Sequence, residues 1–128
     1  VLLICALLDE VFIKKCIEIC DELGLTALVE AHDEEEIRMA VNAGARVIGV
    51  NNRNLKDFTV DIHNSTRLRE FAPEGTLFVA ESGIKTREDV KAFADEKVDA
   101  VLVGETLMRA EDKTQMLAYL RGEIKNED

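Results

Sequence analysis

Two carboxylic acids stand where short apolar runs of the chain end. They are Glu30 and Glu81, and Asn51-Asn52-Arg53-Asn54 follows a third apolar run. A carboxyl group at the mouth of an apolar site has a raised pKa and can move protons. A guanidinium can bind a substrate carboxylate through its planar fork. The sequence therefore offers two glutamates as acid or base groups and Arg53 as an anion ligand.

Glycines after the last two apolar runs indicate a second kind of site. Ser82-Gly83 and Gly104 offer backbone N–H groups with little side-chain obstruction. Residues 104–108, Gly-Glu-Thr-Leu-Met, predict a short extra helix directly after their strand. In eightfold β/α barrels, phosphate is often bound by the loops after strands seven and eight, at the start of such a helix. Two interpretations remain open at this point: a phosphate site, or glycines that only permit tight turns.

The elements that position these residues are predicted to be repeated β-α units. Five apolar runs recur along the chain, with amphipathic stretches between them; they are residues 1–8, 26–30, 46–50, 76–80 and 100–103. Each run is apolar nearly throughout, which is typical of strands buried on both faces of a parallel sheet. Two architectures fit: five consecutive units of a partial (β/α)8 TIM barrel, or an open flavodoxin-like sheet. Both place function at the carboxyl ends of the strands.

Helix caps and breakers mark the stretches between the runs. A further helix is predicted to begin at Asp61 and to end before Pro73. Gly24 is expected just past the end of the first helix, where a left-handed conformation is common. Side chains that can accept a hydrogen bond from the first helical turn predict three other helix starts; these are Asp9, Asp33 and Thr86 (in a capping box with Asp89). A last helix is predicted over roughly residues 112–121.

The three cysteines lie in the first fifth of the chain. Cys16 and Cys20 are four residues apart and share a face of the first predicted helix, but further metal ligands at a suitable spacing are missing. We therefore predict no metal site, and expect them on a buried stripe with Phe12 and Leu23. An odd number of cysteines, Cys5 included, favours a reducing, cytoplasmic setting.

Composition narrows the class of partner. The 128 residues are 47% hydrophobic and 33% charged, with a formal net charge of −10. This is enough for one domain with a core, and no apolar run is long enough to span a bilayer. The acidity argues against nucleic acid and against anionic membranes, which attract Lys/Arg patches. The first apolar run has no basic segment before it, so no signal peptide is expected.

Length and the first residues indicate a piece of something larger. A whole (β/α)8 barrel needs about 200 residues or more. The chain also opens inside an apolar run without an initiator Met. We therefore expect residues 1–128 to form a single domain that is the C-terminal part of a phosphate-binding TIM barrel.

Four segments, taken in order, closely resemble the indole-3-glycerol-phosphate synthase family, the (β/α)8 barrel of the tryptophan pathway. They are residues 28–32, 44–55, 79–84 and 101–108, and the combination of Asn-Asn-Arg-Asn-Leu with Glu-Ser-Gly-Ile is specific. The resemblance covers nearly the whole chain and implies strands four to eight of the barrel. It implies a lyase that converts 1-(2-carboxyphenylamino)-1-deoxyribulose 5-phosphate to indole-3-glycerol phosphate, carbon dioxide and water. It implies no organic cofactor and no metal.

The resemblance also implies a role for each candidate site residue. Glu30 matches the base that assists dehydration, and Asn51 matches an amide that orients the substrate. Arg53 and Glu81 match substrate contacts. The remaining four match the phosphate cradle, mostly through backbone N–H groups; they are Ser82, Gly83, Gly104 and Glu105.

The departure from the family is large. The family's first three strands, with a general-acid lysine, a second lysine and a further glutamate, have no counterpart here. The lysines at 14, 15, 85 and 91 fall in predicted helices or loops. We expect the isolated chain to bind phosphate weakly, to be inactive, and to self-associate through its exposed edges, for example as a homodimer.

Two alternatives stay open beside the synthase. The first is another phosphate-binding barrel, such as a relative of phosphoribosylanthranilate isomerase. The Asn-Asn-Arg-Asn motif at residues 51–54 disfavours it. The second is a non-catalytic, phosphate-binding, half-barrel-like fragment that self-associates.

Overall fold

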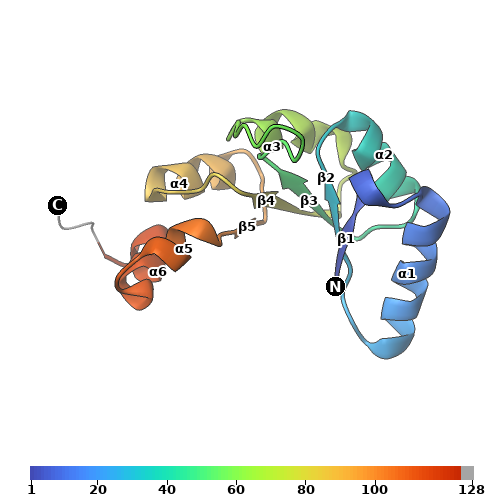
Figure 1. Ribbon diagram of the computed structural model, residues 1–128, viewed down its shortest axis with the longest axis horizontal. Coiled ribbons are helices and arrows are strands. Elements are labelled where there is room, and N and C mark those ends of the chain that lie inside the picture. Colours follow the sequence, from blue (N-terminus) through green and yellow to red (C-terminus); the bar gives the residue numbers. More distant parts are fainter. Residues whose placement is uncertain (125–128) are drawn as a thin grey trace.

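The structure, a computed structural model, describes residues 1–124 as five strands with helices between them (Figure 1). The strands are β1 (Leu2–Ile4), β2 (Leu28–Ala31), β3 (Val47–Asn51), β4 (Leu77–Glu81) and β5 (Ala100–Leu102). The α-helices are α1 (Glu10–Leu23), α2 (Glu34–Asn42), α3 (Asn64–Leu68), α4 (Arg87–Asp95), α5 (Glu105–Arg109) and α6 (Lys113–Arg121). Two short 3₁₀ helices are η1 (Cys5–Leu7) and η2 (Arg69–Phe71).

The strands form one parallel sheet, as the apolar runs predicted. Each strand pairs with the next along the chain, so the order is β1-β2-β3-β4-β5. A flavodoxin-like sheet instead places its first strand between the second and the third. The sequential order is that of consecutive TIM-barrel units, and the fold is α/β of the partial-barrel kind.

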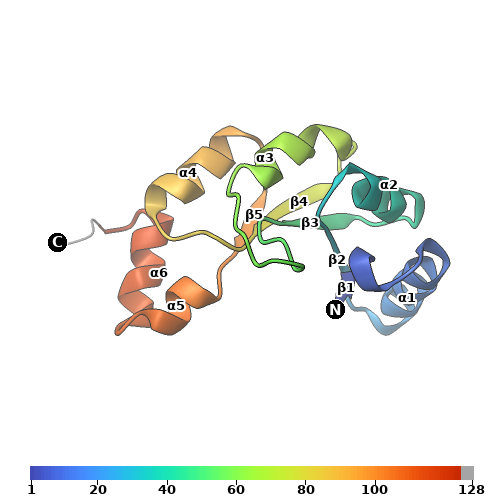
Figure 2. The same ribbon diagram turned by 45° about the horizontal axis from the view of Figure 1, so that its top comes forward.

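The helices lie around the outside of the curved sheet. Figures 1 and 2 show α1, α2, α3 and α4 following one another along it, with α5 and α6 at the β5 end. The core lies between these helices and the sheet, and its fully buried side chains include Ile13, Ile37, Ile48, Val50 and Phe78. Among the described residues, no helix is both long enough and apolar enough to cross a membrane.

Side-chain caps explain where most helices begin; those at Asp9, Asp33 and Thr86 were predicted, and the one at Asp112 was not. The side chains of Asp9, Asp33 and Asp112 each accept a backbone N–H three residues later. Thr86 and Asp89 form the predicted capping box in both directions. Each cap satisfies an N–H group that has no partner inside the helix. Gly24 ends α1 in the left-handed region, at φ 68°.

Two predicted boundaries are wrong. The first apolar run does not continue as a strand to residue 8, because η1 follows β1 and Leu8 N–H donates to the Cys5 carbonyl at 3.3 Å. The helix expected from Asp61 begins at Asn64 instead. The Asp61 carboxylate accepts His63 N–H at 3.0 Å and so closes a local turn before the helix. An apolar run alone does not show where pairing stops, and an aspartate favours turns as well as caps.

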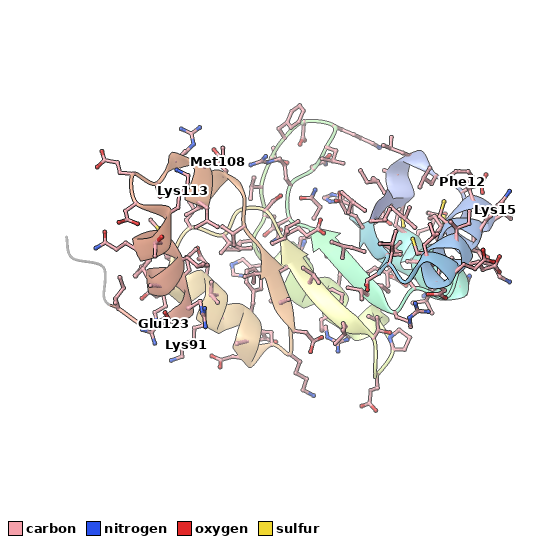
Figure 3. All side chains as sticks on the ribbon, turned by 90° about the horizontal axis from the view of Figure 1, so that it is seen from below. Phe12, Lys15, Lys91, Met108, Lys113 and Glu123 are labelled. Atoms are coloured by element: carbon pink, nitrogen blue, oxygen red, sulfur yellow. The ribbon has the colours of Figure 1, made fainter. Side chains whose placement is uncertain are left out.

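The stripe predicted for α1 is confirmed at Cys20 and wrong at Phe12 and Leu23. The buried residues are Ile13, Ile17 and Cys20, whereas Phe12 is 50% exposed and Leu23 67% exposed. Figure 3 shows Phe12 at the outer rim of the molecule. Apolar side chains occur all round this helix, so periodicity did not single out the one face that packs on the sheet.

Candidate functional site

The carboxyl ends of the strands border a cavity of about 890 Å³. It lies between the loops that follow β3, β4 and β5, with α5 on one side. All eight residues singled out from the sequence line it: Glu30, Asn51, Arg53, Glu81, Ser82, Gly83, Gly104 and Glu105. The structure thus brings together side chains that lie up to 75 positions apart in the sequence, from 30 to 105.

Asn51 connects the strands at the buried end of the cavity. It is the last residue of β3, and its side-chain Nδ2 donates to Glu30 Oε1 at 3.1 Å. Its Oδ1 in turn accepts Arg53 N–H at 2.9 Å. The amide orientation is therefore fixed from both sides, and one oxygen of the Glu30 carboxyl is held by a neutral donor.

Glu30 and Glu81, which we call the carboxyl pair, lie together inside this buried end. They are 7% and 2% exposed. The pKa of Glu81 is raised to about 8, first by burial and then by its hydrogen bond to the Glu30 carboxyl and the negative charge there. Two adjacent carboxylates in an apolar site cannot both ionise easily. Glu81 therefore holds a proton at neutral pH, and the pair can act as a combined proton donor and acceptor.

The more exposed part of the cavity lining carries paired charges, which we call the arginine rim: Arg53, Glu105 and Arg109. Arg53 Nη2 donates to Glu105 Oε2, and Arg109 Nε donates to Glu105 Oε1, both at 3.0 Å. Arg53 first, and then Arg109, lowers the pKa of Glu105. The guanidinium that the sequence offers to a substrate carboxylate is already bound by a carboxylate of the protein.

The turn after β4 has an unusual backbone. Ser82 and Gly83 both lie in the left-handed region, at φ 69° and 78°. Asn52 Nδ2 holds the turn by donating to the Ser82 carbonyl at 3.1 Å. Thr106 Oγ1 donates to the Ile84 carbonyl at 2.5 Å, which ties α5 to this same loop. The two glycine-containing loops are therefore fixed against each other.

Some cavity and supporting residues were not found from the sequence. Lys85 and Arg109 line the cavity, and Lys85 stands directly after the Glu-Ser-Gly-Ile motif. Its position directly after that motif could have identified it as a cavity residue from the sequence. Beneath the loops, Asn52 Oδ1 accepts both the Ser65 backbone N–H at 3.0 Å and its hydroxyl at 2.7 Å. His32 Nδ1 lies 3.0 Å from the Asn51 carbonyl, which is a structural contact next to the site.

The family model described as indole-3-glycerol phosphate synthase matches residues 1–120. The chain belongs to the indole-3-glycerol phosphate synthase family. A curated protein of that name from Ruminiclostridium cellulolyticum is 58% identical over 122 residues, which are 95% of this chain and 47% of that protein. Another from Leuconostoc mesenteroides subsp. mesenteroides is 54% identical over 123 residues, which are 96% and 47% of the two chains. This synthase-family chain thus spans about half the length of the curated relatives it matches.

A solved structure independently matches the fold of this synthase-family chain. It is 3-hexulose-6-phosphate synthase from Salmonella typhimurium, with a TM-score of 0.71. The match covers 94% of this chain and 59% of that one at 19% identity. At this identity the likeness shows the fold alone, and that fold is of the TIM-barrel type.

Proposed function

We propose that residues 1–128 form the C-terminal part of a phosphate-binding TIM barrel, strands four to eight. We propose further that the complete gene product is an indole-3-glycerol-phosphate synthase of tryptophan biosynthesis. Its substrate would be 1-(2-carboxyphenylamino)-1-deoxyribulose 5-phosphate, and its products indole-3-glycerol phosphate, carbon dioxide and water. The observation that carries the proposal is one cavity, lined by all eight candidate residues, in a chain of this family.

The buried end of the cavity supports the acid-base part of this reaction. Glu30 would be the base that assists dehydration, because it lines the cavity and its carboxyl group is held in place there by the Asn51 amide. Asn51 would orient the substrate through the same amide. Glu81 would contact the substrate as a protonated acid, since its pKa of about 8 keeps it neutral near pH 7.

The open end supports binding of the charged groups of the substrate. Arg53 would lie near the anthranilate carboxylate, once that group competes with Glu105 for the guanidinium. The phosphate would lie against the two fixed loops, contacted by backbone N–H groups of Ser82, Gly83, Gly104 and Glu105. Neither step calls for an organic cofactor or a metal.

The isolated chain is proposed to bind without turnover. Ring closure requires that the substrate carbonyl be protonated as carbon attacks it. Of the residues that line the cavity within 1–124, Lys85 is the one lysine, and it lies on the loop after β4 rather than at a strand end. The general-acid lysine would come from the first three strands of the barrel, together with the family's second lysine and further glutamate.

The exposed sheet edges support a second candidate, a non-catalytic phosphate-binding fragment that self-associates. Strands β1 and β5 form the two edges of the sheet, and each exposes a large apolar side chain: Leu2 is 48% exposed and Leu102 is 50% exposed. Unpaired apolar edges favour association with a second copy, so a homodimer is proposed for the isolated chain. As for any member of this pathway family, we propose a cytoplasmic location, with neither nucleic acid nor membrane as partner.

The deciding experiment is an amide NMR titration of the 128-residue chain with indole-3-glycerol phosphate, followed by a rate assay. We expect saturable shifts at Ser82, Gly83 and Gly104, and none at Gly75, which lies in the loop that leads into β4 from the opposite end. We also expect no product formation by this chain and turnover by the complete gene product. The absence of saturable shifts in a folded sample would contradict the proposed phosphate site. Turnover by the 128 residues alone would contradict the proposal that this chain lacks the general acid.

A further inference from the structure

Gly49 occupies the middle of β3, where a glycine is not expected. It pairs with Glu30 on β2 and with Val79 on β4. Glycine weakens the interior of a strand, because it costs backbone entropy and offers no side chain to pack. Its φ lies outside the left-handed region, so its backbone conformation does not require glycine. Another reason must account for the missing side chain.

The space beside Gly49 is taken by the carboxyl group of Glu81. A Cβ atom added at Gly49 would lie 2.3 Å from Glu81 Oε1 and 2.9 Å from its Cδ. The Leu28 Cδ1 atom, at 3.2 Å, is the next nearest neighbour and could move by a few tenths of an ångström. Any side chain at this position therefore collides with the carboxyl group itself.

We propose that Gly49 is a positioning residue: its missing side chain leaves the space in which the Glu81 carboxyl lies against Glu30, so that the two share one proton. The proposal rests on the proposed synthase function for its catalytic meaning, and its geometry is independent of that function. Glu81 Oε1 is fully buried and has no hydrogen-bond partner among residues 1–124. An ionised carboxylate would leave a charged, buried oxygen unpaired there, whereas a protonated Glu81 can donate from its other oxygen to Glu30.

The arrangement would place hydrogen-bond donors from two strands on the Glu30 carboxyl. Asn51 Nδ2 donates to one oxygen of Glu30, and the protonated Glu81 supplies a second donor from the next strand but one. Both donors reach the Glu30 carboxyl without bringing a positive charge into the buried end. The charged groups that share the cavity with Glu81 are Glu30, Arg53, Lys85, Glu105 and Arg109.

A carboxyl titration followed by ¹³C NMR tests the proposal on the 128-residue chain. In the unmodified chain Glu81 is expected to titrate near pH 8. In Gly49→Ala the titration is expected about one pH unit or more lower, because the displaced carboxyl leaves its apolar site and its partner. An unchanged titration of Glu81 in a folded Gly49→Ala chain would overturn the proposal.

A double-mutant cycle supplies the matched control. Gly49→Ala is expected to lower the urea midpoint of the unmodified chain, and to leave it unchanged or raise it in the Glu81→Ala background. If Gly49→Ala alone fails to fold, the double variant is still expected to fold, because the colliding carboxyl is gone. An equal fall of the urea midpoint in both backgrounds would mean that the glycine is required by contact with Leu28 or by the backbone, and would overturn the proposal.

Kinetics of the complete gene product then separate this inference from the proposed function. Gly49→Ala is expected to lower kcat about 10-fold to 100-fold with little change in KM, since the substrate phosphate is bound elsewhere. The basic limb of its pH profile is expected to move with the Glu81 titration. Absence of synthase activity in the unmodified protein would refute the function and leave the NMR result standing. Unchanged kcat with normal synthase activity would refute the role of Gly49.

Discussion

Two glutamates that line one cavity have pKa values that move in opposite directions. Glu81 in the carboxyl pair is buried and faces another acid, and its pKa is raised to about 8. Glu105 in the arginine rim is exposed and lies between two guanidinium groups, which lower its pKa. The residue type is the same, and the difference comes from desolvation and neighbouring charge.

This contrast assigns different chemistry to the two ends. When the pKa values of two titratable groups are shifted apart, the group with the raised pKa holds a proton and the group with the lowered pKa stays charged. The carboxyl pair can exchange protons near neutral pH, whereas the arginine rim stays fully charged and can only pair with ions. The cavity therefore has a proton-handling end and a charged end, and the charged end is the one that we propose binds anions; we call it the anion-binding end.

The largest effect is expected at the carboxyl pair. Glu30→Gln keeps the size of the side chain but removes the base, so kcat of the complete gene product should fall about 10²-fold to 10⁴-fold. Initial rates of indole-3-glycerol phosphate formation measure it. The control is Glu34→Gln, the same change at an exposed helix residue that pairs with Arg38 outside the cavity. If the Glu30→Gln enzyme keeps a rate within a few-fold of the unmodified enzyme, Glu30 is not the base.

The second effect is a pH dependence of stability that belongs to Glu81. Its pKa is about 8 in the folded chain and 4.5 ordinarily, so between these values the folded chain holds a proton that the unfolded chain has lost. The contribution is complete below about pH 4.5 and is lost as the pH rises toward 8. Within that window the free energy of unfolding falls by up to about 1.4 kcal/mol for each rise of one pH unit.

Urea unfolding of the unmodified chain and of Glu81→Gln, measured from pH 5 to pH 8, isolates this contribution. The difference between the two slopes is attributed to Glu81, because Glu36, whose pKa burial also raises, is present in both chains. We expect a flatter dependence in the variant. Equal slopes would mean that Glu81 titrates normally, and the contrast with Glu105 would disappear.

The buried end was more predictable from the sequence than the open end. Glu30, Asn51 and Glu81 are the last or next-to-last residues of apolar strands, and parallel strands bring such ends to one edge of the sheet. The short helix after β5 was also predicted, because Gly104 stands between the last apolar run and a helix-forming segment. Patterns that are local in sequence, combined with one rule of topology, are sufficient for these features.

Features that depend on three-dimensional neighbours were not predictable. Arg53 and Glu105 lie 52 positions apart, and no spacing rule shows that they pair. The role proposed for Gly49 depends on a carboxyl of the neighbouring strand β4, 32 positions later in the sequence. Periodicity alone identifies this glycine only as a weak strand former. The buried face of α1 was misassigned at Phe12 for the same reason, because the neighbouring sheet decides which of several apolar stripes is covered.

A matched pair of glycine substitutions tests the loops of the anion-binding end. Gly83→Ala should lower the free energy of unfolding by about 1–3 kcal/mol, because its φ is +78° and the new Cβ would lie 2.6 Å from Val60 Cγ1. Gly104→Ala should leave stability nearly unchanged, since nothing lies within 4 Å of its Cβ and its φ is −111°. Urea unfolding of both variants measures the difference. Equal losses at the two positions would contradict the geometry of the turn.

The smallest effect on stability, and an opposite effect on binding, is expected at Glu105. Glu105→Gln removes an exposed carboxylate from between Arg53 and Arg109, and exposed ion pairs contribute little to folding. The urea midpoint should therefore stay close to that of the unmodified chain. Affinity for inorganic phosphate, measured by NMR titration, should rise several-fold, because a negative charge leaves the anion-binding end and the two guanidinium groups become available. The gain should shrink at high salt, where the Debye length falls to about 3 Å at 1 M. A weaker affinity in Glu105→Gln would mean that the carboxylate holds the arginines in their binding positions, and that the rim acts by geometry rather than by charge.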